Sequence, residues 1–394
     1  EAVVAVESPP HRGSMAALRW GHDPAALADA IDLYLVRDPL ADGRDPARPA
    51  AALAAARARL GEKARVAALL GADRATTAPA SSVGTVGTGL ARAAALDTAP
   101  LIDGTPFTSS GALTLILASE FHGLRASIRD WNRWLVGQHG WLGDRAGAGP
   151  LAIYCPPALT WWKDAPVEPL VEAVCVAAVR LGLPLRLVGD EEWDGVTTLI
   201  VPPGQVPGLD ARLARFTGGG GRVIALQQMR TGSVGRPLWT GYEPLRPGWR
   251  HAPVVRRITA RRALSGARWH AGSGARRRLA RWLRLPGALG AEPVERSLPD
   301  AMVGELAAAV AEVCPRVRST EPVLFTMWRE PGGGMQWHLV NTAPHPQRVT
   351  ILTGGFASGW TSAPEQGESR QVFGSDIGVS LQRYKVLRLP PEQS

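Results

Sequence analysis

Carboxyl side chains follow two candidate β-strands in the first third of the chain. Glu7 comes directly after the apolar run Ala2–Val6, and Asp103 comes directly after Pro100–Ile102. Carboxyl groups held at strand ends can donate and accept protons, which is the chemistry of general acid and base catalysis. Plainer interpretations stay open, because Glu7 also fits a polar strand end and Asp103, which precedes a glycine, fits an ordinary turn.

Aromatic side chains add a second kind of candidate site. Trp131 and Trp134 are three residues apart, and aromatic faces suit the apolar face of a pyranose ring, so the pair predicts a surface for stacking on sugars. The same spacing equally fits one face of a packed helix. His11 and Arg12, in the loop after the first candidate strand, are predicted to line the same pocket, together with Trp20.

The elements that must position these residues alternate through residues 1–149. The predicted strands are Ala2–Val6, Ile31–Val36, Arg65–Leu70, Pro100–Ile102 and Leu124–Ile128. The predicted helices are Pro24–Ala30, Ala47–Leu60, Val86–Leu96, Gly111–Glu120 and Asp130–Val136. Such β/α repeats predict an α/β fold with part of a TIM-type barrel, which needs about eight strands to close. Since the chain enters a strand almost at once, a truncated or processed N-terminus is expected.

A second α/β unit begins at residue 150. Its predicted strands are Leu151–Cys155, Leu185–Val188, Thr197–Val201 and Arg222–Leu226, with helices over Glu168–Leu181 and Leu209–Phe216. This alternation predicts a parallel sheet. The unit resembles a class I glutamine amidotransferase domain, which needs a nucleophilic Cys on a sharp turn. Ala225-Leu226-Gln227-Gln228 holds no Cys or Ser there, so amide chemistry is not expected from residues 150–320, which also include a predicted helix over Asp300–Val313.

From residue 321 the apolar periodicity changes to two. Val323–Arg329 and Met335–Asn341 flank a Gly-rich turn and predict a hairpin. Gln347–Leu352, Arg370–Phe373 and Val379–Leu389 continue the pattern. Residues 321–394 are therefore predicted to form a small antiparallel β-sandwich.

The order of partial barrel, amidotransferase-like domain and β-sandwich resembles glycoside hydrolase family 42, the β-galactosidase type. Three stretches carry the likeness: Ser119–Ile128 resembles the last barrel strand, Asp130–Trp134 the Trp-bearing loop after it, and Leu381–Leu389 the last sandwich strand. The resemblance implies that the strands present are barrel strands four to eight.

The resemblance also implies the roles of particular residues. The acid/base carboxyl of this superfamily ends strand four and the nucleophile ends strand seven, which places these roles on Glu7 and Asp103. Retaining hydrolysis of a β-linked sugar holds the two carboxyls about 5–5.5 Å apart, and the acid needs a raised pKa. Asp130, Trp131 and Trp134 would contact the carbohydrate substrate. Relatives are often trimers, so a homo-oligomer is expected.

Two departures from the family pattern support an alternative function. The usual Asn before the acid/base residue is Val6 here, and Asp103 replaces the usual Glu. The alternative is a non-catalytic carbohydrate-binding or assembly protein with a degenerate barrel. Glu120, beside a histidine, is expected to cap or solvate a helix end rather than to react.

Composition limits the remaining classes. The net charge is +9, but only Lys63, Lys163 and Lys385 are lysines, and an Arg-, Ala-, Gly- and Pro-rich chain is typical of GC-rich coding. A nucleic-acid partner is therefore not expected, although an Arg cluster over residues 256–281 could contact anions. Three unpaired cysteines predict a reduced, cytoplasmic protein. No membrane partner, metal or other cofactor is expected, since neither an apolar run of about 18 residues nor a zinc-like spacing occurs.

Overall fold

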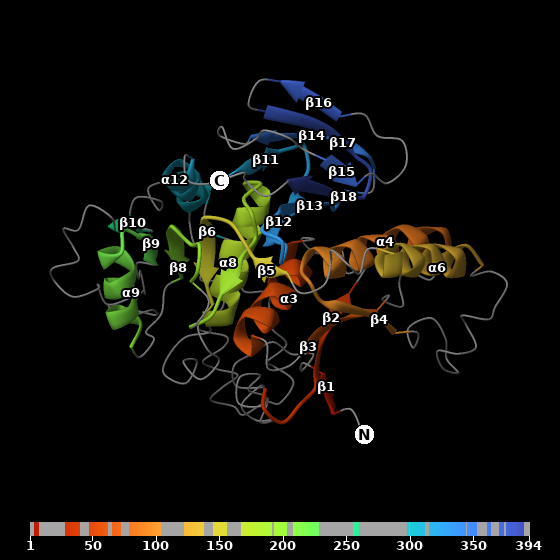
Figure 1. The fold of residues 1–394 in the computed structure, drawn as a ribbon, viewed down its shortest axis with the longest axis horizontal. Helices are drawn as coiled ribbons and strands as arrows, with labels where there is room; N and C mark the ends of the chain where they lie inside the picture. The colour runs from red at the N-terminus through yellow and green to blue at the C-terminus, as the bar shows by residue number, and fades with distance from the viewer. Residues whose placement is uncertain are drawn as a thin grey trace, which may run out of the picture.

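The computed structural model describes most of the elements of the chain. The described residues are 4–7, 28–39, 47–61, 65–71, 79–103, 122–137, 145–155, 167–190, 193–202, 208–227, 255–259, 298, 300–311, 315–343, 345–352, 361–363, 370–373 and 376–389. They form mixed α/β structure with two parallel and two antiparallel sheets (Figure 1). Within these residues, no helix is long and apolar enough to cross a membrane.

The first parallel sheet has four strands in chain order, β1-β2-β3-β4. Their bounds are Ala5–Glu7, Leu33–Pro39, Arg65–Gly71 and Ala99–Asp103, and the helices that follow β2 and β3 are α3 (Ala47–Leu60) and α4 (Pro79–Ala95). Crossovers between parallel strands are right-handed. When successive strands are added at the same edge of the sheet, the connecting helices therefore all lie on one face. A β/α barrel is wound in this way, whereas a doubly wound sheet reverses direction. The winding thus agrees with the barrel predicted for residues 1–149, and its closure stays a prediction.

The two faces of this sheet differ in what covers them. Tyr34, Val36 and Leu70 are buried in the same core cluster as residues of α3 and α4. On the alternate positions, Leu35 is only half-buried and Leu101 keeps 39% of its surface exposed. The helix-covered face is therefore the packed one, and the other face is apolar, as the interior of a barrel requires.

The strand predicted at Leu124–Ile128 is wrong. Residues His122–Gly137 form one helix, α6, which packs beside α4 (Figure 1). Apolar side chains recur at Leu124, Ile128, Trp131 and Leu135, which is the spacing of a helical stripe. The predicted helix over Asp130–Val136 is the second half of α6. The predicted helix Gly111–Glu120 lies outside the described residues, and so does most of Pro24–Ala30, whose last residues, 28–30, form a turn.

The second parallel sheet is formed by residues after 150, where alternating strands and helices were predicted. Its strands are β6 (Leu151–Tyr154), β7 (Leu187–Val188), β8 (Thr198–Val201), β9 (Arg222–Gln227) and β10 (Val255–Thr259), with helices α8 (Val167–Arg180), α9 (Leu209–Gly218) and α12 (Asp300–Val310). All the strands are parallel, in the order β10-β9-β8-β6-β7. From β6 the winding runs to β7 and then reverses, which is the doubly wound order 2-1-3-4-5. The two parallel sheets are therefore wound in different ways.

The strands predicted after residue 321 lie in two antiparallel sheets. One has the order β11-β14-β17-β16 and the other β15-β18-β13-β12-β5. The bounds are β5 (Ala146–Gly147), β11 (Arg316–Arg318), β12 (Val323–Arg329), β13 (Met335–Asn341), β14 (Gln347–Leu352), β15 (Thr361–Ala363), β16 (Arg370–Phe373), β17 (Asp376–Leu381) and β18 (Tyr384–Leu389). The single strand predicted over Val379–Leu389 is wrong, because the chain bends at residues 382–383 and passes from one sheet to the other.

The sheet that contains β12 and β13 is buried on both faces. Phe325 and Trp337 point into the core between the two sandwich sheets. Leu324 and Val340 belong instead to the cluster formed with α4 and α8. β12 is therefore buried at every position except its last, and Figure 1 shows the sandwich lying over α4 and α8. This sheet is the surface on which the three parts of the chain meet.

Candidate functional site

Glu7 and Asp103 lie at the carboxyl end of the first sheet, where a β/α barrel carries its active site. Glu7 is the last residue of β1 and Asp103 the last residue of β4. The pairing register sets Glu7 level with Leu35 and Asp103 level with Gly71. Since successive strand residues alternate between faces, the register assigns positions 7 and 103 to the face away from α3 and α4.

The separation of the two positions is large on a flat sheet. β2 and β3 lie between them, so three strand spacings separate β1 from β4, about 14 Å. Asp103 also lies four register positions beyond the level of Glu7, which is about 13 Å along the strands. Paired carboxyls at about 5–5.5 Å are therefore possible only if the sheet curls about this face, as it does in a barrel.

The other predicted site residues are not brought to this edge by the described structure. His11 and Arg12 lie outside the described residues. Asp130 is exposed on α6, where its Oδ1 lies 3.4 Å from Nε of the neighbouring Arg129. Glu120 also falls outside the described part of the chain.

Trp131 and Trp134 pack against the β-sandwich. Their ring centroids lie 5.9 and 5.4 Å from that of Tyr384 on β18, and 5.7 Å from each other. Both side chains are partly buried on the main core. These contacts are those expected if the two tryptophans form one face of a packed helix. Stacking on a sugar stays a prediction.

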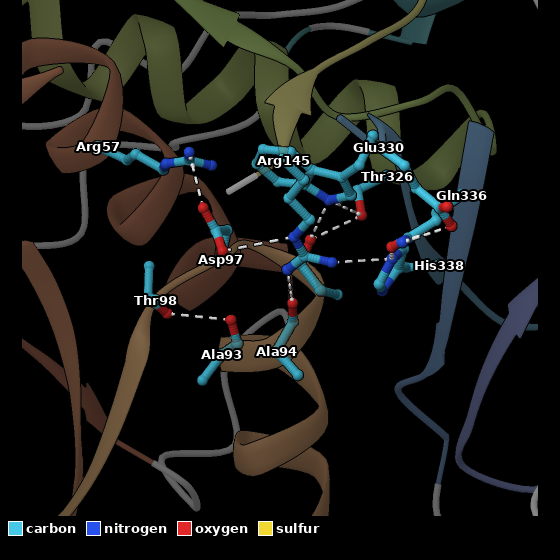
Figure 2. Close-up of polar contacts among 12 residues, drawn as sticks. Arg57, Ala93, Ala94, Asp97, Thr98, Arg145, Thr326, Glu330, Gln336 and His338 are labelled. Carbon is cyan, nitrogen blue, oxygen red and sulfur yellow. Dashed lines mark hydrogen bonds and ion pairs between the residues drawn. The ribbon is translucent and has the colours of Figure 1, made fainter. Parts of the chain in front are cut away.

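A buried polar cluster that the sequence did not indicate lies where α4 meets the sandwich (Figure 2). At its centre is Arg145, just before β5, whose side chain is 1% exposed. Its guanidinium donates to the carbonyl of Ala94, lies 3.4 Å from Asp97 Oδ1 and 2.9 Å from His338 Nε2, and stacks 4.7 Å from the Trp328 ring centroid. We name this cluster (Arg57, Asp97, Arg145, Trp328, His338 and the carbonyls at the end of α4) the Arg145 junction.

The Arg145 junction satisfies the carbonyls that the end of an α-helix leaves without intrahelical partners. Thr326 Oγ1 and Trp328 Nε1 both donate to the carbonyl of Ala95, at 2.7 and 2.8 Å. A guanidinium at this end also interacts favourably with the helix dipole. The sandwich is thereby attached to α4 by hydrogen bonds as well as by apolar contact.

Asp97 holds an unusual position in this junction. The amide of Thr98 donates to Ala93 O at 2.9 Å and that of Asp97 to Ala94 O at 3.3 Å, which is a Schellman ending with Asp97 in the left-handed position, at φ 54°. Glycine fills the corresponding place after α3 and α8, at Gly61 and Gly182. The aspartate after α4 differs from these glycines in that its carboxylate pairs with Arg57 at 2.8 Å and with Arg145 at 3.4 Å.

We expect Asp97→Asn to lower the free energy of unfolding by about 1–2 kcal/mol, because two charge-assisted contacts are lost at a site that is partly screened by solvent. Asp97→Gly should cost less, since glycine relieves the left-handed strain of roughly 1 kcal/mol. Urea unfolding of both variants measures this order. The control is Asp194→Asn at an exposed position. Equal stability of Asp97→Asn and the wild type would contradict the role given to the carboxylate.

The tautomer of His338 follows from its neighbours. Arg145 can only donate, so His338 Nε2 accepts, and Nδ1 carries the proton towards Tyr384 Oη at 2.6 Å. The amide oxygen of Gln336, Oε1, lies 3.0 Å from the same Nε2, and the Gln336 amide nitrogen donates to Glu330 Oε1 at 2.9 Å. Burial, and then the charge of Arg145, hold the pKa of His338 well below its usual value. The ring is therefore neutral, and its protonation would place two cations in contact.

This arrangement predicts a stability that depends on pH. The unfolded chain binds a proton at His338 near pH 6.5, whereas the lowered pKa of the folded ring delays protonation. Above about pH 6.5 the ring is neutral in both states and the full free energy of unfolding is present. As the pH falls from there through the folded pKa, the unfolded chain binds a proton that the folded ring does not, and that free energy decreases. Unfolding free energies between pH 7.5 and 5 should therefore fall less steeply in His338→Gln than in the wild type. His345→Gln, at an exposed position, is the control, and parallel pH profiles of His338→Gln and the wild type would refute the assignment.

The Arg145 junction lies at the opposite end of the first sheet from Glu7 and Asp103. α4 ends immediately before β4 begins, so its last carbonyls are at the amino end of the strands. In β/α barrels this end serves stability and the carboxyl end serves chemistry. The junction is thus a structural attachment, and the carboxyl end of the sheet remains the candidate active site.

A second polar cluster lies at the carboxyl end of the doubly wound sheet. Tyr154 Oη donates to Asp190 Oδ1 at 2.7 Å, and Arg212 of α9 pairs with the same oxygen at 2.5 Å. Burial raises the pKa of Tyr154 well above its usual value. Burial alone would raise the pKa of Asp190, but the hydrogen bonds from Arg212 and Tyr154 lower it. The three side chains satisfy one another, which is typical of a structural cluster.

The described residues contain no group of three or more His, Cys, Asp or Glu side chains that could hold a metal ion. Cys155 and Cys175 are buried thiols, and burial raises the pKa of Cys175. Gln227 ends β9, so the strand expected to precede a nucleophile ends at a glutamine.

Comparison with known proteins gives distant likenesses in structure alone. No family model and no curated protein sequence matches the chain. A β-galactosidase from the haloarchaeon Halorubrum lacusprofundi is similar over 93% of this chain and 61% of its own, with TM-score 0.43 and 12% identity. An exo-carrageenase of family GH42 from Bacteroides ovatus is similar over 79% of this chain and 39% of its own, with TM-score 0.38 and 10% identity. The chain thus spans less than two thirds of either protein, and scores this low assign neither a fold family nor an activity.

Proposed function

We propose that the protein is a retaining glycoside hydrolase that acts on a β-linked sugar, with Glu7 as acid/base and Asp103 as nucleophile. The observation that carries the proposal is the placement of these two residues. They close the first and fourth strands of a sheet wound in chain order, and the register assigns both positions to the face away from the helices. In the family that the chain resembles, these roles lie on barrel strands four and seven. Those two strands, like β1 and β4, have two strands between them.

The chemistry follows from two carboxyl groups on one face. Asp103 attacks the anomeric carbon while Glu7 gives its proton to the leaving oxygen, so that the glycosidic bond breaks as a glycosyl ester forms. Glu7, now ionised, takes a proton from water, and the oxygen of that water displaces Asp103 from the sugar. The two inversions return the original configuration. No metal or other cofactor takes part in either step.

Hydrolysis of a panel of aryl β-glycosides by the full-length gene product tests the proposal. We expect turnover of at least one sugar, and its loss in Glu7→Gln and Asp103→Asn. The matched control is Glu321→Gln, an exposed carboxylate of the sandwich, which should retain wild-type activity. Unchanged turnover in the two site variants would overturn the assignment of these residues.

A non-catalytic carbohydrate-binding or assembly protein is the second candidate function. It is favoured by the position before Glu7, which is Val6, and by the four-residue register offset between the two carboxylates. If this candidate is right, calorimetry should detect binding of a sugar, and no hydrolysis of that sugar should be measured. Absence of binding to any glycan would count against both candidates.

Assembly into a homotrimer belongs to the same proposal. The resemblance assigns the subunit contact to the amidotransferase-like domain. Sedimentation velocity of the full-length product should then give a species of three times the chain mass. A monomer at all concentrations would contradict the trimer but would not bear on the proposed hydrolysis.

A further inference from the structure

Position 37, an arginine, shares the face and the edge of the first sheet with positions 7 and 103. In β2, Tyr34 and Val36 are buried on the helix side while Leu33 and Leu35 are half-buried on the other. Continuing this alternation, position 37 falls on the face away from α3 and α4. Arg37 is followed only by Asp38 and Pro39 within the strand, so it lies at the carboxyl end.

The register places Arg37 between the two carboxylate positions. Glu7 is level with Leu35, which comes two residues before Arg37 in β2. Asp103 is level with Gly71 of β3, and Gly71 is level with Pro39, which comes two residues after Arg37. One strand spacing and two residues separate positions 7 and 37, which is about 8 Å between Cα atoms. Position 38, the neighbouring aspartate, falls on the opposite face together with positions 70 and 102.

A guanidinium at this place has a consequence for the proposed acid. A nearby positive charge favours the ionised form of a carboxyl group, whereas a general acid must hold its proton when the substrate is bound. An anionic group on the substrate would offset the positive charge of an arginine beside the proposed acid. Guanidinium is also the side-chain group best matched to the planar geometry of carboxylate and to other oxyanions.

We propose that Arg37 binds an anionic substituent of the sugar, a carboxylate or a sulfate ester, so that the natural substrate is an acidic glycoside. The inference rests on the proposed function for the site, but it concerns binding and can be measured without turnover. The net charge of +9 acts in the same direction, because it attracts polyanionic glycans.

Binding and hydrolysis are measured separately on matched sugars that differ only in the acidic group. The probes are a neutral β-galactoside, the corresponding β-galacturonide and a sulfated β-galactoside, each as a free ligand and as an aryl glycoside. Calorimetry on Glu7→Gln of the full-length product should show at least tenfold tighter binding of one acidic sugar than of the neutral one. Arg37→Gln, placed in the Glu7→Gln background, should remove that preference, and Arg37→Lys should keep part of it.

The outcomes separate the two claims. In the wild type, kcat/KM should favour the acidic substrate, and Arg37→Gln should reduce kcat/KM for that substrate about 10- to 100-fold without reducing kcat/KM for the neutral one. Equal losses on both substrates, or equal binding of acidic and neutral sugars, would overturn the role of Arg37. Anion-selective binding that depends on Arg37 without any hydrolysis would support this inference and refute the proposed enzyme. Preference for the galacturonide over the sulfated sugar identifies a carboxylate, and the reverse identifies a sulfate.

Discussion

Arg145→Met lowers the free energy of unfolding by about 3–5 kcal/mol, because a buried charge is removed and its partners stay behind. Asp97 loses one of its two cations, His338 Nε2 loses its donor, and the carbonyl of Ala94 loses its capping group. Each buried polar group left without a partner costs about 1–3 kcal/mol. Urea unfolding followed by far-ultraviolet circular dichroism measures the change.

Two further variants make the Arg145 experiment decisive. Arg318→Met, at an exposed position on β11, should stay within about 0.5 kcal/mol of the wild type. The double variant Arg145→Met with His338→Leu should recover part of the loss, since replacing both members of a buried polar pair by apolar groups is far less costly than removing one. A loss below about 1 kcal/mol for Arg145→Met alone would contradict the role of the junction.

Asp103→Ala and Glu7→Ala should differ in how they lose activity. Without its nucleophile, Asp103→Ala should lose on the order of a thousand-fold or more in kcat on every substrate. Glu7→Ala should keep fast glycosylation of dinitrophenyl glycosides, whose leaving group needs no proton, and lose turnover of alkyl glycosides, whose leaving group does.

Added azide separates the same two roles by stereochemistry. In Asp103→Ala, azide takes the place of the carboxylate and gives a glycosyl azide of inverted configuration. In Glu7→Ala, azide replaces water in the second step and gives the retained β-azide. Identical substrate profiles in the two variants, or no effect of azide on either, would refute the assigned roles.

The sequence predicted elements whose signals are local. Helix α3 and strands β12, β13, β14 and β16 have the predicted bounds, because period-two alternation and Ala-rich helical runs are read from neighbouring residues. β9 could be predicted to end without a Cys or Ser, since that requires only the identity of the residues. The parallel pairing of β6 to β9 followed from alternating strands and helices.

The errors arise where tertiary contacts decide. Leu124–Ile128 begins and ends with an apolar residue, as a short strand can, and only the stripe continuing to Trp131 and Leu135 shows the helix α6. The bend at Gln382-Arg383 was missed because β17 and β18 are both apolar and adjacent, although they belong to different sheets.

The Arg145 junction was missed for a related reason. Its members come from α3, the end of α4, the segment before β5, and β12 and β13, so no spacing in the sequence brings them together. One local signal was available, an aspartate rather than a glycine at the end of the Ala-rich run before β4. For the candidate active site, the sequence placed Glu7 and Asp103 at strand ends, and the register added that both positions share one face with Arg37.

Trapping the glycosyl ester tests the central claim most directly. The full-length product is incubated with the dinitrophenyl 2-deoxy-2-fluoro-β-glycoside of the sugar that it hydrolyses best, and the protein is digested and examined by mass spectrometry. The account predicts one fluoroglycosyl group per chain, on the peptide that contains Asp103, and none in Asp103→Asn. A label on another carboxylate, or an active protein that takes up no label, would contradict it.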